Sequence, residues 1–354
     1  MGEYGPPPPR RRTPPSVRPL PPEEDAPMTV CIAALCESAT MVVCTADRMW
    51  TSDDLQHEPE ETKIAELGDH GAALVAGDSA VHSSVFRNLF ADLDDDPSHR
   101  STWGLASLYS RHWWRVRDAS VDVAVFKPRL TDRQSFYGNQ RSLSPEFVAR
   151  VEKELVDFSL PRVETIVAGV ESATRDGEMH AHARLFVVDN DRRYTDQPGE
   201  RSEDGRGHAA IGRGAPHALA FLAIAKHSRH WSLARTLLTV YRAKKRAERA
   251  PNVGPTTDMW ILGPWPHGLT QVQPDLLDAL EHAHKHIEDA NERTTATVMG
   301  VLQDAIKISE IPDPGTEESD KRGGDKAANA PGVRGGAEKG EPKDWDTNRH
   351  GANE

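Results

Sequence analysis

Short apolar runs arranged as successive hairpins constrain the fold of this chain more than any other sequence feature. Residues 29–36 (TVCIAALC) and 40–46 (TMVVCTA) are apolar, rich in β-branched side chains, and separated by a short link. Residues 62–67 and 71–77 repeat the arrangement around Gly68. Runs of this length bounded by turn residues predict paired antiparallel strands.

Helical periodicity begins directly after Gly77, where Asp78 and Ser79 offer an N-cap and apolar residues recur every three to four positions from Val81. Further along, the patterns predict helices over 102–118, 144–158, 215–230, 232–250 and within 274–308, and strands over 164–170, 181–188, 208–212, 257–262 and 269–272. Hairpin strands and helices thus gather in separate blocks. This order predicts an α+β fold of antiparallel sheets covered by helices, not an alternating parallel fold.

The two ends of the chain have a different composition from its middle. Residues 1–27 are mostly Pro, Arg and Glu, and residues 312–354 are rich in Gly, Lys, Asp and Glu. Such segments bury too little apolar surface to offset the entropy of ordering them. We therefore expect disordered tails at 1–27 and 312–354, and one folded domain over 28–311.

The net charge and the cysteine content of the chain indicate which binding partners and which cellular compartment to expect. The formal net charge is −12, which argues against nucleic acid as a main partner, and the basic run 242–249 is interpreted as a solvated helix face. No apolar run approaches the roughly 18 residues of a membrane helix. The three cysteines, Cys31, Cys36 and Cys44, make an odd count that favours reduced thiols in a cytoplasmic protein.

Two groups of histidines resemble metal ligands at first sight. His282, His284 and His286 lie in a predicted helix, where only the first and last share a face, and His180 and His182 lie on one side of a predicted strand. Each group offers fewer ligands than a metal site needs. We expect neither a metal nor a cofactor.

The order of these motifs resembles the proteasome β-subunit family of N-terminal nucleophile hydrolases, in particular its bacterial proteasome-like members that begin Met-Thr-x-Cys. The similarity rests on residues 28–51, on Thr62-Lys63-Ile64, on Ala76-Gly77-Asp78 before a helix, and on residues 211–214 followed by a helix with Ala218-Leu219. It covers most of residues 28–263. The resemblance implies a four-layer αββα sandwich.

The resemblance also implies a set of catalytic residues. The family uses a first-residue threonine as nucleophile and that residue's α-amino group as base. Matched by motif, Thr29 is the expected nucleophile, Lys63 the supporting cation, Asp47 its carboxylate partner, and the N–H of Gly77 the oxyanion donor. Asp47 independently calls for a partner, because it closes an otherwise apolar strand. Cys31 lies inside the strand, and we expect it to be a buried structural thiol.

For Thr29 to act, the residues before it must be absent from the mature chain. Either translation starts at Met28 and that methionine is trimmed, or residues 1–28 are a propeptide that the enzyme cuts from itself; the composition of 1–27 favours the first route. The implied activity is hydrolysis of an amide bond, in a peptide or in a small amide, without a cofactor. The family also implies a homo-oligomer.

Two positions depart from the family pattern. Arg213 stands where active members carry a serine between two glycines, and residues 250–254 (APNVG) replace an Asp followed by Ser-Gly. The missing groups normally hold the threonine amine and a water molecule. The departures favour an alternative, in which the chain is a catalytically inactive subunit that serves as a homo-oligomeric scaffold.

Overall fold

The computed structural model describes residues 29–52, 55–68, 71–95, 101–175, 178–189, 199–264 and 268–309, so the predicted tails 1–27 and 312–354 lie outside the described residues. Its two main sheets are antiparallel and each has five strands. Together with the helices they confirm the predicted α+β class.

The first sheet has the strand order β10-β1-β2-β11-β12. Its strands are β1 (Cys31–Cys36), β2 (Met41–Asp47), β10 (His208–Ile211), β11 (Thr257–Leu262) and β12 (Leu269–Gln271). The second sheet has the order β5-β6-β7-β8-β9. Its strands are β5 (Ile64–Glu66), β6 (Gly71–Gly77), β7 (Val163–Arg175), β8 (Glu178–Asp189) and β9 (Gly199–Ser202). A separate small hairpin joins β3 (Trp50–Ser52) to β4 (Leu55–His57).

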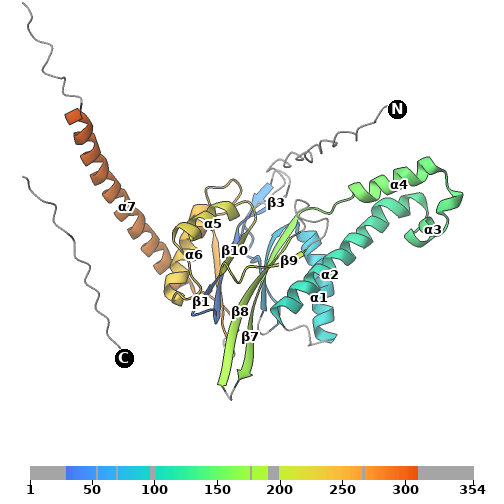
Figure 1. Cartoon of the computed structure of the whole chain (residues 1–354), viewed down its shortest axis with the longest axis horizontal. Helices are drawn as coiled ribbons and strands as arrows, with labels where there is room; N and C mark the ends of the chain where they lie inside the picture. Colours follow the sequence, from blue (N-terminus) through green and yellow to red (C-terminus); the bar gives the residue numbers. More distant parts are fainter. Residues whose placement is uncertain are drawn as a thin grey trace, which may run out of the picture. The chain divides into compact units, whose positions relative to one another are not determined.

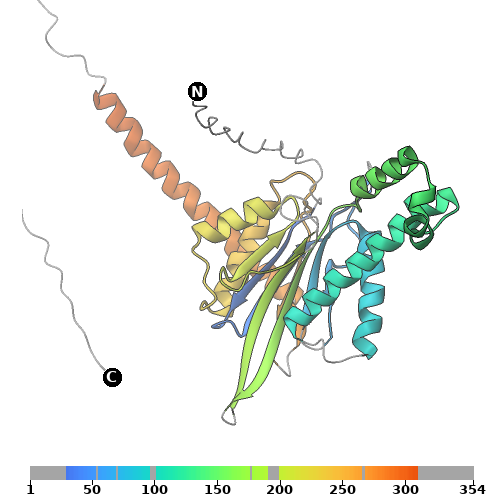
Figure 2. The ribbon, with the colours of Figure 1, turned by 45° about the vertical axis from the view of Figure 1, so that its right-hand side comes forward.

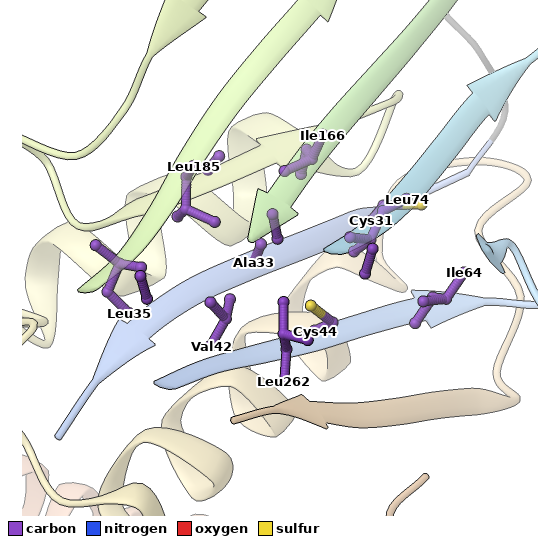
Figure 3. Packing of buried hydrophobic residues seen from close by; sticks show 14 of the residues in the cluster. Cys31, Ala33, Leu35, Val42, Cys44, Ile64, Leu74, Ile166, Leu185 and Leu262 are labelled. Atoms are coloured by element: carbon purple, nitrogen blue, oxygen red, sulfur yellow. The ribbon is translucent and has the colours of Figure 1, made fainter. Parts of the chain in front are cut away.

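The two sheets pack against each other through one apolar cluster, part of which Figure 3 shows. Alternate residues of β1, such as Cys31, Ala33 and Leu35, belong to this cluster, whereas Val30 and Ile32 pack on the opposite side. Both faces of the strand are therefore buried. This explains why the sequence shows continuous apolar runs and no polar alternation.

Helices cover the outer face of each sheet (Figures 1 and 2). On the first sheet they are α5 (Ala215–Ile224), α6 (Leu233–Ala247) and the beginning of α7 (Pro274–Ser309). On the second sheet they are α1 (Ser79–Asp95) and α2 (Thr102–Val121). The predicted cap of α1 is confirmed, because Asp78 Oδ1 accepts the Val81 N–H at 2.9 Å.

Beyond α2 the chain builds a small helical extension with its own core. A π-helical turn η3 (Asp122–Phe126) and a 3-10 turn η4 (Lys127–Arg129) continue α2, and they are followed by α3 (Arg133–Gly138), η5 (Gln140–Ser142) and α4 (Pro145–Asp157). This second core contains Val121, Val125, Phe126, Phe136 and Val151. The predicted helix over 102–118 is thus too short, and α3 was not predicted.

The end of one predicted helix differs from expectation, whereas the predicted hairpin over 29–46 is confirmed. Helix α5 ends at Ile224, not at 230, because Lys226 adopts a left-handed backbone with φ of 54°. The link between β1 and β2 places Glu37, Ser38 and Ala39 in the left-handed region, although none is glycine. The link is held from outside, since Glu37 N–H donates to the Trp231 carbonyl at 2.8 Å.

The contacts divide the chain into two units, residues 1–293 and 294–354. The first unit contains both sheets. The described part of the second is the C-terminal segment of α7, which exposes Val298, Val301, Leu302 and Ile306. Among the described residues, no helix combines the length and apolar character that a bilayer crossing requires.

The core between the sheets gives a direct test of the fold. Leu185 is fully buried there, so Leu185→Ala should lower the free energy of unfolding by about 2–5 kcal/mol through lost transfer energy and a residual cavity. Urea denaturation measures the change. Val156, 78% exposed on α4, is the control, and Val156→Ala should change stability by less than about 0.5 kcal/mol. Equal effects of both substitutions would contradict the packing.

Candidate active site

Thr29 lies two residues before the first residue of β1. Between Thr29 and β1, one further residue pair extends the first sheet. Val30 and Asp47 face each other there: the Asp47 N–H donates to the Val30 carbonyl at 3.2 Å, and the Val30 N–H donates to Asp47 Oδ1 at 3.0 Å. On the other side, Gly214 N–H donates to the Thr29 carbonyl at 3.1 Å. Backbone contacts thus fix the position of Thr29 from two neighbouring segments.

Three of the four predicted residues come together at this point. Lys63 Nζ donates to Thr29 Oγ1 at 2.5 Å and lies 3.1 Å from Asp47 Oδ1. Thr29 Oγ1 in turn donates to Asp47 Oδ1. All three side chains are buried, and Lys63, the most accessible of them, is 4% exposed. The hydroxyl therefore has a cation and a carboxylate on either side.

A buried ion pair persists only when its remaining polar atoms are also satisfied. Lys63 Nζ donates to the Met49 carbonyl as well. Asp47 Oδ2 accepts the N–H of Gly254 at 3.0 Å, in addition to the bonds at its other oxygen. The carboxylate therefore receives donors from four residues, and its orientation is fixed.

Gly77, the fourth predicted residue, ends β6 close to this cluster. Val75, two residues earlier, donates its N–H to the Lys63 carbonyl at 3.0 Å, and its own carbonyl accepts the Cys31 thiol at 3.3 Å. Gly77 has a φ of +114°, and a Cβ there would lie 2.2 Å from the Arg162 carbonyl oxygen. Among the described residues, the hydrogen bonds that join Thr29, Asp47 and Lys63 do not include Gly77.

A tight turn that contains Arg213 wraps around Thr29. A Cβ on Gly212 would lie 2.4 Å from the Thr29 carbonyl oxygen, and Gly212 has a φ of +82°. Both facts require glycine at this position. Arg213, the next residue in this turn, is half-buried.

Glu164 of β7 holds the same turn from the second sheet. Its Oε2 accepts the Gly212 N–H at 2.7 Å, and its Oε1 accepts from Arg162 Nη2. Glu164 was not among the predicted site residues. An acid on the same strand face as Ile166, which packs between the sheets, was the signal that could have revealed it.

Lys244 of α6 supports Asp47 indirectly and contradicts the prediction of a solvated basic face. Its side chain is fully buried, and its ammonium donates to the Gly254 and Pro255 carbonyls, each at 2.8 Å, and to Glu248 Oε1 at 2.6 Å. Burial lowers the pKa of Lys244, while the Glu248 carboxylate acts in the opposite direction. A fully paired ammonium thus anchors the segment that offers Gly254 N–H to Asp47.

Cysteine chemistry is disfavoured at this site. All three cysteines are free and buried. Burial raises the pKa of the Cys36 and Cys44 thiols to about 12 each, and it raises that of Cys31 further. The thiolate, which is the reactive form, is therefore scarce near neutral pH.

The described residues contain no group of three or more His, Cys, Asp or Glu side chains that could hold a metal ion. Comparisons with protein-family models and with curated proteins find no match for this chain.

The turn around Thr29 predicts a strong effect of adding one methyl group. Gly212→Ala should lower the free energy of unfolding by about 1–3 kcal/mol, because the methyl group meets the Thr29 backbone and φ is positive. Thermal or urea denaturation measures the loss. Gly205→Ala is the matched control, since a Cβ there meets no atom within 4 Å, and it should be nearly neutral. Equal stability of both variants would show that residue 212 is not in close contact with the Thr29 backbone.

Because the thiols are buried, we predict that they do not react with thiol reagents in the folded protein. Native protein should not react with a disulfide reagent such as dithiobis(nitrobenzoate) under mildly alkaline conditions, because burial blocks access and raises each thiol pKa. After denaturation all three cysteines should react. Rapid modification of the folded protein, followed by mass mapping to Cys31, would reopen the possibility of a cysteine nucleophile.

Proposed function

We propose that this chain is a proteasome-like hydrolase of the N-terminal nucleophile type, which cleaves amide bonds through Thr29. The observation that carries the proposal is the contact of Lys63 Nζ with Thr29 Oγ1 at 2.5 Å, beside the buried carboxylate of Asp47. Two antiparallel sheets packed together, with helices on their outer faces, are compatible with the αββα sandwich of that class.

The residue types suit acyl transfer. A threonine hydroxyl is a weak nucleophile and needs an adjacent base. When Thr29 is the first residue, its α-amino group, with an ordinary pKa of about 7.7–8.0, serves as that base. It takes the proton of Oγ1 as the oxygen attacks the amide carbon. The resulting ammonium gives that proton to the leaving nitrogen as the C–N bond breaks. Water then hydrolyses the Thr29 ester.

Each neighbour has a role in this scheme. The Lys63 ammonium stabilises the developing charge on Oγ1, and Asp47 keeps that ammonium in place. The N–H of Gly77 is the proposed donor to the oxyanion. No cofactor is needed. We further propose a peptide or small-amide substrate, a homo-oligomeric assembly and a cytoplasmic location.

The scheme requires removal of the residues before Thr29. Residues 1–28 lie outside the described part of the chain. Two routes lead to a free Thr29: a start at Met28 followed by trimming, or self-cleavage of a propeptide. Processing is therefore the first condition for activity.

A scaffold role is the second candidate, and the segment before Gly254 favours it. Ala250 and Val253 are buried apolar residues where active members of the family carry an aspartate and a serine. They cannot hydrogen-bond to the amine of Thr29. If the chain is a scaffold, the buried cluster of Thr29, Asp47 and Lys63 serves to join the two sheets.

A peptidyl epoxyketone tests the proposal, because it requires a hydroxyl and a free α-amine on one residue. Protein released to begin at Thr29 should gain the inhibitor mass, and the adduct should map to Thr29. Full-length protein that retains Met28, and Thr29→Ala, should gain none. Lys63→Met should slow labelling by roughly a hundredfold or more, as loss of a preorganised charge does elsewhere.

Two controls ensure that the labelling result can be assigned to Thr29. Thr29→Ser retains the hydroxyl and should still be labelled. Intact mass must first show that the sample begins at residue 29, and circular dichroism must show that it is folded. Absence of an adduct on such a sample would falsify the proposed hydrolase function and support the scaffold role.

A further inference from the structure

A buried histidine contacts the peptide group that carries the proposed oxyanion donor. His82, in the first turn of α1, is 4% exposed, and its Nε2 lies 3.1 Å from the Ala76 carbonyl oxygen. Its Nδ1 lies 2.8 Å from the hydroxyl of Tyr109, a residue of α2 that is 1% exposed. Neither residue was singled out from the sequence.

The partners determine which ring nitrogen carries the proton. A carbonyl oxygen can only accept, so Nε2 must be protonated and must donate to Ala76. In a neutral ring Nδ1 is then an acceptor, and the Tyr109 hydroxyl donates to it. Burial lowers the pKa of His82 to about 4, against smaller opposite effects of the hydrogen bond to Ala76 and of the Asp78 charge, so the ring is neutral near pH 7.

The same bond fixes the direction of the Gly77 N–H. The Ala76 carbonyl and the Gly77 N–H belong to one peptide group, and a trans peptide points them in opposite directions. With the carbonyl held by His82, the N–H points away from α1. The alternation along β6 agrees, because Val75, two residues earlier, directs its N–H to the Lys63 carbonyl.

We propose that His82, held by Tyr109, is a positioning residue that aims the Gly77 N–H at the carbonyl oxygen of an amide bound at Thr29. This inference rests on the hydrolase function proposed above. A histidine that serves only to fill the core would contribute to stability alone. A positioning histidine also contributes to the transition state, where charge develops on that oxygen.

Two polar substitutions separate these roles. In His82→Gln the side-chain amide nitrogen can occupy the place of Nε2 and still donate to Ala76. In His82→Asn the amide nitrogen corresponds to Nδ1 and cannot reach that carbonyl. With a fluorogenic peptide amide, His82→Asn should lower kcat about 10- to 100-fold with KM nearly unchanged, and His82→Gln should recover most of the rate.

A peptide boronate provides a readout that stability does not move. Its adduct with Thr29 puts a hydroxyl oxygen in the oxyanion position, so His82→Asn should bind it at least about tenfold more weakly, in parallel with kcat. Tyr109→Phe should show a smaller loss in the same direction, since it leaves Nδ1 without its donor. Thermal midpoints of all variants are measured alongside.

A second measurement does not depend on activity. Only Gly77 and Gly169 follow an alanine in this sequence, so labelling alanine carbonyl carbon and glycine nitrogen leaves two linked amide signals. His82→Asn should shift the Gly77 signal and leave that of Gly169 in place, and His82→Gln should leave both near their wild-type positions. Gly169 lies within β7 and is the internal reference.

The outcomes separate the two proposals. If wild-type protein beginning at Thr29 neither hydrolyses the amide nor binds the boronate, the proposed hydrolase function is wrong. The Gly77 amide signal then still decides whether His82 orients the Ala76–Gly77 peptide group. If wild type is active but His82→Asn stays within about threefold in kcat and boronate affinity, the positioning role is wrong. The positioning role would also be wrong if the Gln and Asn variants lost kcat and boronate affinity equally and in proportion to the fall in their thermal midpoints.

Discussion

The hydrogen-bonded ion pair of Lys63 with Asp47 is the interaction on which the arrangement of this molecule depends. Asp47 ends β2 of the first sheet, and Lys63 directly precedes β5 of the second. The pair therefore joins the two sheets at one edge of their shared apolar core, near Cys31 and Ile64. Apolar packing holds sheets together without specifying their register, whereas a buried charge pair is costly in any other alignment. Thr29 takes its place between these two charges.

The groups that support the site come from different parts of the fold. Lys244, on a helix of the first sheet's outer layer, anchors the segment that donates to Asp47. Glu164, from the second sheet, holds the turn around Thr29. His82, from the second sheet's helical layer, holds the peptide before Gly77. In the described part of the chain, none of these three side chains hydrogen-bonds to the Thr29 hydroxyl. They position backbone groups instead, so the site is organised mainly through main-chain donors.

The sequence allowed prediction of the elements whose signals are local. The strand over 257–262 is confirmed with its bounds, and the acid in an apolar strand end correctly called for a cationic partner. Features that depend on tertiary packing were not predictable. Lys244 lies in a run of similar basic residues, and only the fold decides which of them is buried. The left-handed link at 37–39 contains no glycine. It is stabilised by hydrogen bonds that Glu37 and Ala39 donate to the carbonyls of Trp231 and Arg229, far along the sequence.

The long hairpin β7–β8 extends past its neighbours (Figures 1 and 2). β6 pairs with β7 only as far as Gly169, and β9 pairs with β8 only from Phe186 onward. Over residues 170–175 of β7 and 178–182 of β8, each strand therefore has one edge that no other described strand occupies. Such an edge offers a row of amide and carbonyl groups to any extended chain. This ribbon is one place where a strand from another chain can extend the sheet, and its exposed His180 and His182 are polar residues of the kind that discourage nonspecific pairing.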